Sequence, residues 1–82
     1  MGVLETLHDI ASRAGDAGVR LLDVEDAIEH VADGEPVEAL LCIKEALACE
    51  YAKRDSFIAQ LLGEACSVLK IGVLMGLEGG KA

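Results

Sequence analysis

Apolar residues in the first 33 positions recur at alternating steps of four and three. This spacing is typical of the buried seam of a helix. It holds for four repeats, through Val3, Leu7, Ile10, Ala14, Ala17, Leu21, Val24, Ile28 and Val31. Because the phase is unbroken, the pattern predicts one continuous helix over about residues 3–33, roughly 46 Å long.

Two glycines, Gly15 and Gly18, are the weak point of this helix. Each costs about 1 kcal/mol relative to alanine in a helix interior. Asp23, followed by Asp26, would also suit the start of a second helix. The apolar seam keeps its phase across both glycines, however. We therefore expect a continuous helix, bent at most, whose small residues let a partner helix approach closely.

The end of the first helix is marked by the segment Asp33-Gly34-Glu35-Pro36. Gly34 stands where a left-handed C-terminal cap belongs, and Pro36 suits the first position of a new helix. The sequence therefore predicts a turn at residues 34–35.

The second half predicts a helix over about residues 36–77, followed by a frayed tail at 78–82. Its apolar stripe is broad and includes Leu40, Ile43, Leu47, Tyr51, Ile58, Leu61, Ala65, Val68 and Met75. An alternative is a break at 53–56, with Asp55 or Ser56 capping a third helix. No residue there requires positive φ, which favours the continuous helix.

These elements predict an all-α fold, an antiparallel hairpin of two long helices. Apolar residues surround most of the helix between 57 and 77, more than one neighbouring helix can cover. We therefore expect a homodimer or larger assembly, with two hairpins forming a four-helix bundle. The expected interface residues are Phe57, Leu61, Leu62, Ala65, Leu69 and Val73.

Charge is distributed unevenly along the 82 residues. The net charge is −8, and residues 1–35 hold nine of the fifteen acidic side chains but only two of the seven basic ones. This balance disfavours direct nucleic-acid binding, which needs a basic surface. The densest acidic run is either a solvated face or a surface for a basic partner. We predict that the partner is bound by Asp23, Glu25, Asp26, Glu29 and Asp33.

Few residues are candidates for chemistry. Glu5 and His8 form a Glu-x-x-His pair, which supplies metal ligands in some carboxylate bundles, but the chain has no second copy. His30 is either a proton-sensitive group or a cation at a helix end. Cys42, Cys49 and Cys66 lie in apolar runs and are expected to be buried thiols. We predict no metal, no cofactor and no enzymatic activity.

Location and function are inferred from the same features. The longest apolar run, Ala65–Leu77, is too short for a bilayer and contains Lys70, so we expect a cytoplasmic protein without membrane contact. The favoured function is a regulator, adaptor or inhibitor that binds a partner protein with a basic or apolar surface. One alternative is a phage-type acidic inhibitor that mimics nucleic acid, and another is a carboxylate–histidine metal bundle.

Overall fold

The computed structural model describes residues 2–79, with side chains through Met75. All regular elements in this range are helices, which confirms the all-α prediction. They are α1 (Val3–Asp16), α2 (Leu22–Ala32), α3 (Pro36–Leu47), α4 (Glu50–Arg54) and α5 (Ser56–Gly79).

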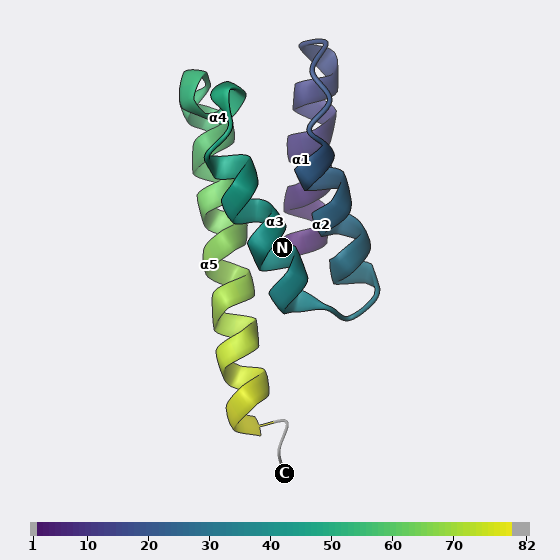
Figure 1. Cartoon of the computed structure of the whole chain (residues 1–82), viewed down its shortest axis with the longest axis vertical. Coiled ribbons are helices and arrows are strands. Elements are labelled where there is room, and N and C mark those ends of the chain that lie inside the picture. Colours follow the sequence, from purple (N-terminus) through teal and green to yellow (C-terminus); the bar gives the residue numbers. More distant parts are fainter. Residues whose placement is uncertain (1, 80–82) are drawn as a thin grey trace.

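Four of the helices pack side by side in a closed order. α1 contacts α2 and α5, and α3 contacts the same two helices. Successive members of this set run in opposite directions, while the short α4 joins α3 to the start of α5 (Figure 1). The predicted hairpin of two long helices is therefore wrong. One chain supplies the four-helix packing that we expected from two.

The first predicted helix is divided at Gly18, which has φ of +79°. The Val19 N–H donates to the Ala14 carbonyl (2.8 Å) and closes the end of α1. This left-handed cap reverses the chain, so that α2 returns along α1. The prediction of a continuous helix over 3–33 is therefore wrong. The apolar seam keeps its phase because α1 and α2, one on each side of the turn, both direct their apolar residues toward the same core.

The turn at Gly34 is confirmed. Its φ is +76°, and the Glu35 N–H donates to the His30 carbonyl (2.8 Å). Pro36 is the first residue of α3, where its missing N–H removes no helical hydrogen bond. The same capping motif therefore ends α1 and α2.

The second predicted helix is divided twice. The alternative break at 53–56 is confirmed, because Asp55 Oδ1 accepts hydrogen bonds from the N–H groups of Phe57 (3.1 Å) and Ile58 (3.2 Å). A further break at Ala48 and Cys49 was not predicted. Neither break needs positive φ, since Cys49 and Asp55 have extended backbone conformations. The continuous helix over 36–77 is thus wrong.

The core is entirely apolar among the described residues, with no buried polar or charged side chain. Each of the four packed helices contributes part of its apolar stripe. The most buried large side chains are Leu7, Ile10, Val24, Ile43, Ile58 and Leu62.

The C-terminal end of α5 extends beyond the α2–α3 turn, along the 45 Å long axis of the molecule (Figure 1). α5 continues to Gly79, and the rest of the predicted tail, 80–82, lies outside the described residues. The segment Ser56–Met75 is long and apolar enough to cross a bilayer, although a core helix of a small bundle passes the same test. It begins nine residues before the run Ala65–Leu77 and exceeds it in length.

Candidate protein-binding faces

The predicted acidic face is distributed over different surroundings. Asp23 and Asp26 lie near α3, where the charge of each carboxylate helps to raise the pKa of the Cys42 thiol. Glu25 instead pairs with Arg20, with Oε2 3.1 Å from Nε. Glu29 and Asp33 are exposed. The structure therefore brings two of the five residues together beside α3.

α3 contributes two further carboxylates to this surface. Burial raises the pKa of the Cys42 thiol, and the charges of Asp26, Asp23, Glu45 and Glu38 raise it further. The two aspartates are on α2 and the two glutamates are on α3, the helix that packs against it. We call Asp23, Asp26, Glu38 and Glu45 the acidic row.

An apolar surface lies next to the acidic row on α3. Val37 and Leu41 are 48% and 57% exposed, so two large apolar side chains of α3 lie at the surface. A shallow, open groove of about 470 Å³ is lined by Leu41, Lys44, Glu45 and Ala48. Val37, Leu41, Lys44 and Ala48 follow one another at steps of four, three and four, so they form one line along the helix. We call Val37, Leu41 and Ala48, with this groove, the α3 face.

A second apolar surface lies on α5. Phe57, Val68, Ile71 and Met75 are between 47% and 66% exposed, and Leu74 beside them is 58% exposed. The alternating steps of four and three that are typical of a helix seam run through Phe57, Leu61, Glu64, Val68, Ile71 and Met75. The Arg13 guanidinium stacks over the Phe57 ring, 4.6 Å from its centroid. We call Phe57, Val68, Ile71 and Met75 the α5 face.

The α5 face differs from the interface that the sequence predicted. Leu62, Ala65 and Leu69 are buried in the core of the chain itself, and a second molecule docking on the surface does not reach them. Leu61 and Val73 are half-buried, and Phe57 is exposed. The sequence showed that α5 is apolar on most sides. It did not show which side faces the core.

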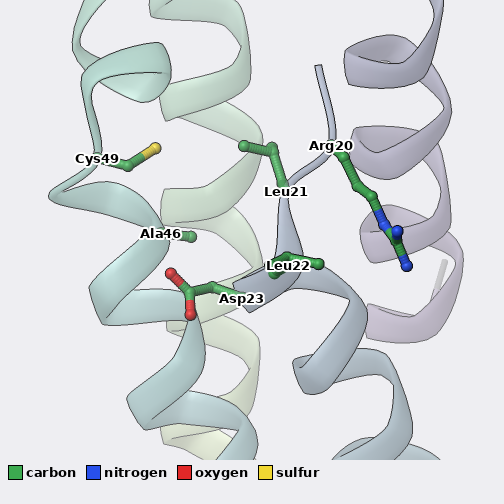
Figure 2. A pocket seen from close by; sticks show the side chains of 6 residues that line it. All are labelled: Arg20, Leu21, Leu22, Asp23, Ala46 and Cys49. Carbon is green, nitrogen blue, oxygen red and sulfur yellow. The ribbon is translucent and has the colours of Figure 1, made fainter. Parts of the chain in front are cut away.

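A small pocket lies between the start of α2 and the end of α3 (Figure 2). It has a volume of about 190 Å³ and is lined by Arg20, Leu21, Leu22, Asp23, Ala46 and Cys49. The side chains of Leu21 and Cys49 point toward each other across it, and Arg20 points away, where it pairs with Glu25 (Figure 2). Ligand pockets begin at about 300 Å³, so this space is too small for a typical organic ligand.

The two histidines have separate surroundings. Glu5 Oε1 accepts a hydrogen bond from the Gly2 N–H (3.3 Å), so this carboxylate helps to start α1. His8 is exposed one turn further on. His30 Nδ1 lies 2.7 Å from Glu35 Oε1. Within the part of the chain that the structure describes, no three His, Cys, Asp or Glu residues are grouped as metal ligands.

Glu38 and Glu45 were missed by the sequence analysis. A signal was present, because residues seven apart lie on the same side of a helix. What the sequence lacked was the packing of α3 on α2, which places these two glutamates near Asp23 and Asp26.

No protein-family model matches the chain, and comparison with curated proteins and with solved structures finds no significant match.

Proposed function

We propose that this protein acts by binding another protein, as a non-enzymatic regulator, adaptor or inhibitor. The observation that carries this proposal is the set of large apolar side chains left exposed on α3 and α5 after the core is complete. An exposed apolar patch commonly marks an interaction surface, because water contact with it is unfavourable. Both faces are on helices, which keep their side chains in fixed positions for a partner.

The buried side chains also favour binding over catalysis. Catalytic sites typically hold titratable groups in a cleft, where burial and neighbouring charges shift their pKa values. The buried side chains among the described residues are all apolar, and the pocket beside Cys49 is small. The three cysteines are unpaired thiols, which suits a reducing compartment such as the cytoplasm.

Self-association through the α5 face is part of the proposal. A seam with steps of four and three is self-complementary, since a second helix of the same sequence packs into it. This arrangement would cover Val68, Ile71 and Met75, which the chain's own helices leave exposed.

The proposal is tested by affinity capture from the native cytoplasm with the wild-type chain and three variants. Leu41→Asp and Ile71→Asp each place a charge on one apolar face without touching the core. A specific partner should be lost with at least one of them, and Leu22→Asp, an exposed residue on α2, should retain it. Equal capture by all four proteins would refute the proposal.

A second candidate function is mimicry of nucleic acid in the basic groove of an enzyme. The acidic row supports it, because Asp23, Asp26, Glu38 and Glu45 present four carboxylates on one surface. Repeating the capture at two salt concentrations separates the candidates. Binding by mimicry weakens steeply with salt, whereas contact through an apolar face persists.

A further inference from the structure

We propose that the α3 face binds an amphipathic helix whose edge toward the acidic row carries Lys or Arg. This inference rests on the protein-binding function proposed above and names the chemistry of the partner. It combines the groove on α3 with the acidic row along its α2 side.

The shape of the α3 face fits a helix. One line along α3 contains Val37, Leu41 and Ala48. It measures about 16 Å from Val37 to Ala48. An amphipathic helix presents apolar side chains at the same spacing and can lie along such a line. The groove between Leu41 and Ala48 provides space for a large apolar side chain of the partner.

The acidic row beside the α3 face favours basic residues on the facing edge of the partner helix. Glu45 lines the groove together with Lys44, and Glu38 lies two turns before Glu45 on the same side of α3. Asp23 and Asp26 are on α2, which packs against α3. No ion pair engages these four carboxylates among the described residues. Lysines or arginines on the facing edge of a partner helix would meet them, which favours this orientation over its reverse.

A second copy of the chain does not fit this requirement. Of its seven basic residues, Arg13, Arg20 and Arg54 pair with Asp9, Glu25 and Glu50. Lys44 lines the groove of the α3 face itself. The exposed α5 face carries Glu64 within its seam. Two acidic rows would repel each other. The α3 face is therefore assigned to a different, basic protein.

The test measures binding of three synthetic peptides by titration calorimetry. One is a Leu/Lys peptide of about four turns with its leucines on one helical stripe. The second is the matching Leu/Glu peptide, and the third is a Leu/Lys peptide with the same composition but no stripe. We expect the first to bind and the other two to bind at least about tenfold more weakly, because they lack the charge or the apolar stripe.

Variants then locate the site. The double substitution Glu38→Gln and Glu45→Gln should weaken the striped Leu/Lys peptide about five- to tenfold, as expected for two exposed ion pairs. Leu41→Asp should abolish its binding. The matched control is the double substitution Asp16→Asn and Glu50→Gln, at two exposed carboxylates on α1 and α4 that belong neither to a proposed face nor to the acidic row. It removes the same charge and should change the affinity less than twofold.

Two outcomes overturn the inference. One is equal weakening by the control and the Glu38/Glu45 variant, which would mean that the peptide responds to net charge alone. The other is amide chemical-shift changes confined to α5, which would place the peptide on the α5 face. In either case the proposed function is decided separately, by whether Ile71→Asp or Leu41→Asp loses the native partner in the capture experiment.

Discussion

His30 and Glu35 face each other across the turn that joins α2 to α3, with Nδ1 2.7 Å from Oε1. Gly34 lies between them, in the left-handed conformation that lets the chain reverse. The hydrogen bond with Glu35 raises the pKa of His30, and the charges of Glu35, Glu38 and Asp26 act in the same direction, while burial opposes them. The pair therefore links the last turn of one helix to the start of the next.

This pair predicts a pH dependence of stability. Because folding raises the pKa of His30 above its ordinary value of 6.5, the folded chain holds this proton more tightly than the unfolded chain. The stabilisation is fully present below about pH 6.5 and is lost as the pH rises through the raised pKa. Urea denaturation from about pH 6 to about pH 9 should show this loss in the wild type. Glu35→Gln should remove most of it, because only the charges of Glu38 and Asp26 then remain, and Glu64→Gln should keep it. Parallel curves for the wild type and Glu35→Gln would contradict the prediction.

The two glycine caps predict backbone strain when Gly18 or Gly34 is replaced by a residue with a side chain. A Cβ at either position meets no atom within 4 Å, so any destabilisation comes from the backbone alone. Gly18→Val and Gly34→Val should each lower the free energy of unfolding by about 1 kcal/mol or more, because a β-branched residue resists positive φ.

Gly15 is the matched control for this series. It also has open space around it, but it lies inside α1 with helical geometry. Gly15→Ala should raise the free energy of unfolding by about 0.5–1 kcal/mol. The urea midpoints of the three variants decide the matter. An unchanged midpoint for Gly18→Val would mean that the chain does not turn there.

The Asp55 cap predicts a loss of about 1 kcal/mol on Asp55→Ala, since the Phe57 and Ile58 N–H groups would lose their shared acceptor. Asp55→Asn keeps an acceptor oxygen and should recover most of the stability. Ser56→Ala, on the next residue, should have little effect. Chemical denaturation measures all three, and equal midpoints for Asp55→Ala and the wild type would mean that α5 does not depend on this cap.

Because the α5 face lies outside the core, we expect a substitution on it to change assembly and a substitution in the core to change folding. Analytical ultracentrifugation should find a dimer or larger species at about micromolar concentration. Ile71→Asp should yield a folded monomer, because Ile71 is 57% exposed within the chain. Leu62→Asp should unfold the chain, since its side chain is fully buried and a charge there lacks a partner. Circular dichroism distinguishes the two results. A wild-type monomer at every concentration would refute self-association.

Local signals in the sequence were sufficient for several features. Gly34 and Pro36 predicted the α2–α3 turn, because a left-handed cap and a proline at a helix start depend only on adjacent residues. Asp55 was, with Ser56, one of two cap candidates in the alternative break at 53–56, for the same reason. The helical class followed from the apolar spacing, which requires no knowledge of what the stripe packs against.

The three-dimensional packing decided the rest. A seam of unbroken phase is compatible with one long helix or with two antiparallel helices that face a shared core, and only the fold-back at Gly18 distinguishes them. The same holds for α5, where Leu62 is buried and Ile71 is exposed although both are large aliphatic residues of one helix. Burial depends on which neighbours surround a side chain, and those neighbours are distant in sequence. For that reason the sequence determined the helical class and the Gly34 turn, whereas the packing of α1, α2, α3 and α5 determined which apolar and acidic residues remain available to a partner.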